Sequence, residues 1–250
     1  MRACVRKVPV SLFALLIVFP ALASGNGDPR QQLLDASHST RINDVDMKPW
    51  HLKVSFNLNG RSGQPPEKGT IEEWWAGLTT WKLRIESPSY TGTVIENRDG
   101  DFRTAGVGPI PLSIRGIEQN IVYPMPMGED LSKSVPHMSH QRLERVSLDC
   151  IQLSEPPIRL PSATFCFDQG SGELRAIINA NSSMLVRDRI SQFEGHAPAL
   201  SIESVEGKTM IASGEVIDLS AMKPEDAIFT PSPDMKRVTD MHTFKVTTAH

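Results

Sequence analysis

The strongest constraint on the fold is a run of nine residues in which apolar and polar side chains alternate. Apolar residues occupy Trp50, Leu52, Val54, Phe56 and Leu58, and polar residues occupy His51, Lys53, Ser55 and Asn57. Successive side chains of a strand point to opposite faces, so this period of two predicts a strand with one buried face. Shorter runs of the same kind cover 70–75, 81–85, 91–97 and 102–104, with turn residues between them. These runs predict an antiparallel sheet.

The second half of the chain repeats this pattern. Strands resume at Leu143, and further ones are expected around Phe165 and Phe167, from Leu174, and over 184–193, 200–205 and 210–219. One helix is expected over about 30–39, after Asp28 and Pro29, with Leu33, Leu34 and Ala36 toward the core. The prediction is a mainly β (α+β) fold. It has a curved antiparallel sheet or half-barrel of about nine to eleven strands, closed by one or two short helices.

Proline interrupts the pattern over residues 106–140, which carry five prolines at positions 109, 111, 124, 126 and 136. That density excludes a long regular element and leaves room for one short helix over 112–122. We interpret this segment as a Pro-rich insert that covers part of a single β-rich domain over 24–236. The tail over 237–250 is expected to be mobile.

The N-terminus has the layout of a secretory signal peptide over residues 1–23. Basic residues among the first seven precede an apolar stretch over 8–20, and small residues at Ala21 and Ala23 precede Ser24. The alternative is an N-terminal anchor helix, but the apolar stretch is shorter than the roughly 20 residues of a membrane span. The residue directly after Ala23 is Ser24 and not Cys, so no lipobox is expected. The predicted location is periplasmic or secreted, with no transmembrane segment after signal removal.

Charge excludes some classes of partner. Removal of residues 1–23 takes away three basic residues and no acidic one, which changes the net charge from −3 to −6. Nucleic acids and anionic lipid surfaces attract basic proteins, so neither is an expected partner. The 227 residues that remain are enough to bury a sizeable core.

Two cysteines, Cys150 and Cys166, remain after signal removal. An even pair in an oxidising compartment predicts a disulfide, here across two neighbouring strands. The alternative is a redox or metal pair. Such pairs favour shorter spacings, and no His lies close to either cysteine in the sequence.

No catalytic constellation is found in the sequence. It has no zinc-protease, nucleophile-elbow or nucleotide-binding motif, so no catalytic residue, cofactor or metal site is predicted. His137 and His140 are the only close histidine pair. They could share a helical face with Glu144 as a third metal ligand, but a solvated loop is the simpler interpretation. Glu72 and Glu73 are neighbours that should point to opposite faces of a strand.

Apolar side chains on the first strands form the candidate ligand-binding surface. Of the adjacent Trp74 and Trp75, one should face inward and the other outward. The predicted apolar wall comprises Trp50, Leu52, Val54, Phe56, Trp75, Trp81, Leu83 and Ile85. A Pro-rich insert should pack against such a wall less densely than a layer of helices. We therefore expect the wall to line a pocket.

The order of these elements resembles the LolA/LppX-like superfamily of outer-membrane lipoprotein carriers and lipoprotein-sorting proteins. The resemblance covers about 30–235. It lies in the 33–36 helix, the strands at 50–54, 69–75 and 81–84, the turn at 167–174 and the closing segment 228–233. The run at 72–77 is also similar to an uncharacterised group of exported acidobacterial-type proteins. The resemblance implies a half-barrel with an apolar cavity for acyl chains. No single residue matches the carriers' gating arginine, for which Arg84, Arg103 and Arg175 are candidates.

Three functions follow from these features. The leading hypothesis is a non-enzymatic periplasmic or exported binder of a lipid or other apolar ligand, with a role in envelope lipoprotein or lipid trafficking. The alternative is an envelope protein-interaction module without a small-molecule ligand, which would pair through its sheet edges. A hydrolase with an unrecognised site is the third. Cavity volume separates the first two, because a filled core favours interaction with a protein.

Export gives the first testable prediction. Signal removal should leave Ser24 as the first residue, because the small residues before it are those that signal peptidase accepts. N-terminal sequencing of the exported protein checks this. A retained Met1 in a membrane fraction would contradict it.

Overall fold

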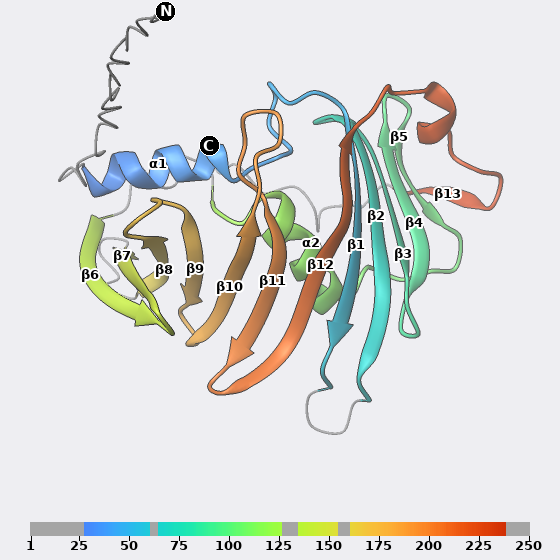
Figure 1. Ribbon diagram of the computed structural model, residues 1–250. Coiled ribbons are helices and arrows are strands. Elements are labelled where there is room, and N and C mark those ends of the chain that lie inside the picture. Colours follow the sequence, from blue (N-terminus) through green and yellow to red (C-terminus); the bar gives the residue numbers. More distant parts are fainter. Residues whose placement is uncertain (1–27, 61–64, 127–134, 155–160, 239–250) are drawn as a thin grey trace, which may run out of the picture.

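The computed structural model describes residues 28–60, 65–126, 135–154 and 161–238, so the predicted signal peptide lies outside the described residues. These residues form one antiparallel sheet of 13 strands with two α-helices and a short 3-10 helix (Figure 1). The strands are β1 (Trp50–Leu58), β2 (Glu67–Gly77), β3 (Thr80–Glu86), β4 (Thr91–Asn97), β5 (Gly100–Thr104), β6 (Val135–Leu143), β7 (Val146–Ser154), β8 (Pro161–Asp168), β9 (Leu174–Asn179), β10 (Ser183–Ile190), β11 (Ala199–Glu206), β12 (Thr209–Ala221) and β13 (Met235–Val238). The helices are α1 (Pro29–Ser39), α2 (Leu112–Val122) and η1 (Asp226–Phe229).

The strand order shows how the sheet is assembled. It runs β13-β5-β4-β3-β2-β1-β12-β11-β10-β9-β8-β7-β6. Two runs of sequential antiparallel strands are therefore joined where β1 pairs with β12, in a register that extends from Trp50 opposite Ala221 to Leu58 opposite Ala212. The strand with the clearest alternation in the sequence thus lies at the centre of the sheet.

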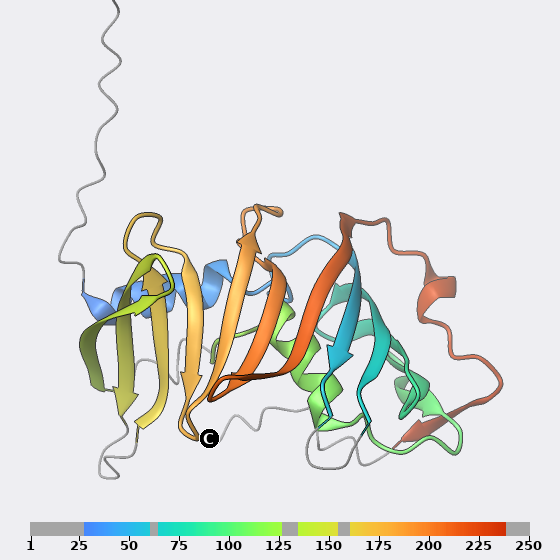
Figure 2. The ribbon, with the colours of Figure 1, turned by 60° about the horizontal axis from the view of Figure 1, so that its bottom comes forward.

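The connection from β5 to β6 positions α2. β5 lies next to one edge of the sheet and β6 forms the other edge. The chain between them must therefore cross the sheet. α2 lies in this connection and packs on the inner face, against β1, β11 and β12 (Figure 2). α2, which lies within the predicted Pro-rich insert, therefore covers part of the inner face of the sheet.

Capping residues set the bounds of both helices. Asp28 caps α1, since its Oδ1 accepts a hydrogen bond from the backbone N–H of Arg30 at 3.0 Å, and Pro29 occupies the first turn. α2 begins directly after Pro111 and ends before Pro124, because proline disfavours helical backbone in the residue that precedes it. Neither α-helix in the described part of the chain combines the length and apolarity needed to cross a membrane.

The main core lies between the inner face of the sheet and the two helices. Leu33 and Ala36 of α1 and Ile114, Ile117 and Ile121 of α2 belong to the same buried cluster as the strand residues. Apart from Trp74, the side chains on the opposite face of β1 and β2 are mostly polar, and they are partly exposed. There, His51 Nε2 lies 3.0 Å from Glu72 Oε1. The period of two in the sequence therefore separates a buried inner face from a solvated outer face.

The adjacent residues Trp74 and Trp75 lie on opposite faces of the sheet, as the sequence predicts. Trp75 is buried and stacks on Trp50, with ring centroids 5.9 Å apart and planes 9° apart. Trp74 lies on the other face, 5.1 Å from the ring of His51 and beneath the ammonium group of Lys82. Glu72 and Glu73 also lie on opposite faces of the sheet, and Glu73 is the buried one.

The predicted strand count is wrong, because both edge strands were missed. β6 begins inside the segment that was interpreted as a Pro-rich insert, and β13 includes Arg237 and Val238 of the predicted tail. Pro136 is compatible with β6 because this strand lies at an edge, where a missing backbone N–H costs less than in a central strand. Residues 239–250 lie outside the described residues.

The predicted disulfide is confirmed. Cys150 and Cys166 are bonded across β7 and β8, where they occupy directly opposite positions. Both are buried in a second, smaller apolar cluster with Leu148 and Ala176. The main core contains Ile151 and Phe165, the next residues along the two strands. The bond therefore joins two strands on the face opposite the helices.

Removal of this bond tests its contribution to stability. Replacement of both cysteines by Ala should lower the free energy of unfolding by roughly 3 kcal/mol, because the bond restricts the unfolded chain. Urea unfolding of the oxidised protein and the variant measures the difference. Two free thiols in the purified exported protein, detected by non-reducing mass analysis, would contradict the assignment.

Candidate functional site

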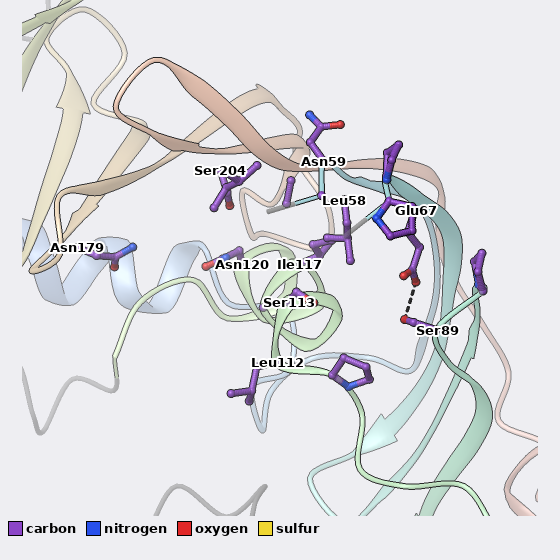
Figure 3. Close-up of a pocket in the computed structure, with 18 residues that line it drawn as sticks. Leu58, Asn59, Glu67, Ser89, Leu112, Ser113, Ile117, Asn120, Asn179 and Ser204 are labelled. Carbon is purple, nitrogen blue, oxygen red and sulfur yellow. Dashed lines mark hydrogen bonds between the residues drawn. The ribbon is translucent and has the colours of Figure 1, made fainter. Parts of the chain in front are cut away.

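One candidate site is a cavity of about 1000 Å³ at one end of α2. Its lining comes from the ends of β1, β2, β9, β11 and β12, from the loop between β3 and β4, and from α2 (Figure 3). The apolar lining residues are Leu58, Pro65, Pro66, Pro88, Pro111, Leu112, Ile117, Ile211 and Ala212. Polar residues also line it, among them Ser89, whose Oγ donates a hydrogen bond to Glu67 Oε1 at 2.8 Å. The volume and the mixture of side chains are typical of a small-molecule site.

The sequence of α2 explains why this space is open. Gly116 lines the cavity, and a Cβ atom added at this position would have no other atom within 4 Å. Leu112, one turn earlier, is 89% exposed beside the same cavity. A larger side chain at position 116 would enter this space. The glycine therefore leaves room on the side of the helix that faces the cavity.

The next residue of α2, Ile117, lies close to the sheet because of another glycine. Gly214 of β12 lies under Ile117, and a Cβ atom at position 214 would be only 2.7 Å from Ile117 Cγ2. Gly214 also lies opposite Phe56 of β1, at the centre of the sheet. The missing side chain lets the helix approach the strands where the apolar wall begins.

A buried polar cluster joins α2 to β2. Glu73 projects from the inner face of β2 and hydrogen-bonds to Glu118 of α2. Arg115 Nη1 lies 2.9 Å from Glu118 Oε2, and Arg115 Nη2 donates a hydrogen bond to Tyr123 Oη at 3.3 Å. Glu73 and Glu118 are 6% and 1% exposed. We refer to Glu73, Arg115 and Glu118 as the α2 latch.

The two carboxyl groups of the latch cannot both ionise readily. Burial, followed by the charge of Glu118, holds the pKa of Glu73 well above its usual range. Burial also raises the pKa of Glu118, although Arg115 opposes that shift. The arrangement is that of a protonated Glu73 which donates to a Glu118 carboxylate paired with Arg115. Its net charge is then zero, which reduces the cost of burying it.

A second cavity, of about 690 Å³, lies beneath α1. Arg187 of β10 borders it and is fully buried; its Nη1 donates to the carbonyl oxygen of Leu174 at 3.2 Å. Among the described residues, Nε and Nη2 have no hydrogen-bond partner. Burial, and then the charge of Arg175, lowers the pKa of Arg187 to about 9, so it stays charged at neutral pH. The lining also holds five carboxylates, at Asp28, Asp35, Asp149, Asp168 and Glu173, which disfavour an anionic ligand here.

The predicted apolar wall is part of the core. Seven of its residues are at most 3% exposed, and Trp81 is half-buried, with its Nε1 donating to Glu96 Oε2 at 3.1 Å. None of the eight residues borders either cavity. α2 and the chain around it occupy the space in front of the wall. A role for the wall in ligand binding therefore stays a prediction that requires α2 to move.

The candidate arginines and histidines lie elsewhere. Arg84 and Arg175 pair with acidic residues on exposed parts of the sheet. His137 and His140 lie on strand β6, so the shared helical face is wrong. His140 pairs with Asp149 at 2.7 Å. Sequence analysis missed Arg115, Arg187 and the pairing of Glu73 with Glu118, because a charged residue on a predicted strand or helix gives no local sign that it is buried.

Comparison with known proteins supports the fold assignment. No protein-family model matches the chain, and no curated protein is significantly similar to it in sequence. Among solved structures, the LolA superfamily protein NE2245 from Nitrosomonas europaea aligns over 81% of this chain and 97% of its own. The TM-score is 0.51 and the identity is 10%.

Two further solved structures align with lower scores. A domain described as an outer membrane lipoprotein-sorting protein, from Vibrio parahaemolyticus, covers 80% of this chain and 97% of its own, with a TM-score of 0.42 and 10% identity. The Pseudomonas aeruginosa MucA/MucB complex covers 84% of this chain and 63% of the matched chain, with a TM-score of 0.38 and 9% identity. The match to NE2245 shows the fold alone, and the protein therefore has the fold of the LolA superfamily, as the sequence resemblance predicts.

Proposed function

We propose that this protein is a periplasmic binder of a lipid or another ligand with an acyl chain, which enters between α2 and the sheet. The observation that carries the proposal is the cavity of about 1000 Å³ bordered by Gly116 and Ile117 of α2. The LolA superfamily fold supports the same class of function. The lining supplies apolar contacts for a chain, and its polar side chains suit a head group.

Movement of α2 would extend this cavity into the apolar wall. Ile117 lies both in the cavity lining and against Gly214 of the sheet, so the cavity and the covered wall meet at one side chain. The α2 latch replaces apolar packing by buried carboxyl groups, which stabilise a closed state less than a purely apolar contact would. A ligand that binds the open state better would shift the helix outward.

A second candidate function, the protein-interaction module, is favoured by β6. This nine-residue strand forms an edge of the sheet, and nearly all of its side chains are exposed. Val135 and Met138 are 41% and 47% exposed. An edge of this kind can pair with an extended segment of another protein.

Gly116→Trp tests the ligand site directly. The indole should enter the cavity, because no atom lies within 4 Å of a Cβ at this position. We expect binding of a fluorescent fatty acid to weaken at least tenfold. Gly116→Ala is the matched control and should keep the wild-type affinity, since a methyl group leaves most of the space free.

Circular dichroism and thermal unfolding must show that both variants fold. Equal affinity of Gly116→Trp and the wild type would place binding elsewhere. A wild-type protein that binds no fatty acid, and that carries no lipid in native mass spectrometry of periplasmic material, would favour the interaction module instead.

The α2 latch predicts a dependence of stability on pH. The raised pKa of Glu73 means that the folded protein keeps a proton which the unfolded chain releases. The stabilisation is complete at a pH below the usual pKa of a glutamate. It is lost as the pH rises from that value through the raised pKa of Glu73 in the folded protein. The slope should reach at most about 1.4 kcal/mol per pH unit.

Glu73→Gln should remove this slope, because the amide neither gains nor loses a proton. Glu203→Gln, the same change at an exposed glutamate of β11, is the control and should keep the wild-type profile. Urea unfolding between pH 5 and 9, a range of roughly four units, measures both. A wild-type profile that is parallel to that of Glu73→Gln would rule out the shared proton.

A further inference from the structure

Three side chains from distant parts of the sequence meet at the end of α1. His38 lies in the last turn of the helix, Asp46 in the loop before β1, and His196 in the connection between β10 and β11. The ligand atoms that they offer all lie within 4.8 Å of one another. His38 Nε2 is 3.9 Å from Asp46 Oδ2, and the two imidazole rings are 5.2 Å apart between centroids.

The ring of His196 is fixed in an orientation suited to metal binding. The residue is 4% exposed, and its Nδ1 lies 3.0 Å from the backbone carbonyl oxygen of His38. A carbonyl oxygen only accepts hydrogen bonds, so Nδ1 carries the proton. In the neutral ring the lone pair is then on Nε2, to which no hydrogen bond is made by any described residue.

The ring of His38 is oriented in the same way. Its Nδ1 lies 3.3 Å from Asp44 Oδ2, and the other oxygen of Asp44 accepts a hydrogen bond from the backbone N–H of Val45 at 2.7 Å. A carboxylate only accepts, so Nδ1 of His38 is the donor and Nε2 is left as the ligand atom. Metal-binding histidines in proteins are held by this kind of contact, from Nδ1–H to a carbonyl or carboxylate oxygen.

We propose that His38, Asp46 and His196 form a binding site for a zinc ion. Two imidazoles and one carboxylate suit zinc and its neighbours in the first transition series better than magnesium or calcium. Ligand atoms around a tetrahedral zinc ion lie about 3.3 Å apart. The ligand atoms here lie up to 4.8 Å apart, so they must move closer together to bind the ion. The side chains of His38 and Asp46 are 61% and 59% exposed and are free to make this movement. Their exposure leaves a fourth position for water.

A zinc ion at this site would bind to α1, the helix that covers the second cavity. Gln31, Asp35 and Ser39 of α1 line that cavity, and His38 belongs to the same helix. His196 belongs to the connection that pairs with the end of α1, where the backbone N–H of Ala197 donates to the carbonyl oxygen of Ser39 at 2.6 Å. A bound zinc ion would therefore fasten α1 to the sheet.

Titration of the tag-free protein with zinc chloride, by calorimetry, tests the proposal. We expect one zinc ion per chain, with affinity at least tenfold lower in both His38→Ala and Asp46→Asn. Because both side chains are exposed, these variants should fold as the wild type does without metal. Asp44→Asn tests the orienting contact and should weaken binding by about 10- to 100-fold.

Thermal unfolding provides a second readout. Zinc should raise the melting temperature of the wild type but not of His38→Ala, and magnesium should raise neither. His140→Ala is the matched control, because His140 is an exposed histidine of β6 that contacts Asp149 and is not one of the three proposed ligands. A wild type that binds no zinc overturns the proposal, as does an affinity that falls with His140→Ala and not with His38→Ala.

Discussion

The connection from β5 to β6 must span the whole sheet, and the arrangement of the site depends on this constraint. The two strands lie at or next to opposite edges because each half of the chain folds as a run of sequential antiparallel strands. The connecting segment cannot pass through the sheet, so it passes over one face. On the inner face, α2 covers the apolar side chains of the central strands and leaves a cavity at one end.

α2 is held to the sheet by two kinds of contact, one apolar and one polar. Ile117 packs closely on Gly214, which is apolar contact of the type that stabilises any core. Glu118 meets Glu73 and Arg115, which buries charge where an aliphatic side chain would be more stable. Gly116, on the cavity side, contributes no side chain at all. A helix with this composition is poorly optimised for permanent closure, which is consistent with a cover that moves for a ligand.

The two helices differ in how they are attached. At the centre of the sheet, α2 contacts β1, β11 and β12 through the core, and it contacts β2 through the latch. α1 lies over the strands of the second half, and its last turn contacts the β10–β11 connection through backbone hydrogen bonds and His196. The disulfide between β7 and β8 stabilises that half from the other face. The half with the second cavity is thus braced from both faces, whereas the larger cavity depends on α2.

The amino-acid sequence by itself determined the local structure and the sheet faces. Alternation placed Trp50 and Phe56 inward and His51 outward, proline set the ends of α2, and two cysteines on paired strands gave the disulfide. The edge strand β6 was not predicted, because Pro136 is unfavourable in most strands and acceptable at an edge. Whether a strand lies at an edge is a property of the assembled sheet. Only the tertiary structure decided that Glu73 meets Glu118, that Gly116 borders open space, and that His38 meets His196. The two contacts join residues 45 or more positions apart in the sequence. The open space beside Gly116 depends on which other elements surround it. A local sequence pattern carries no information about long-range contacts or about surroundings.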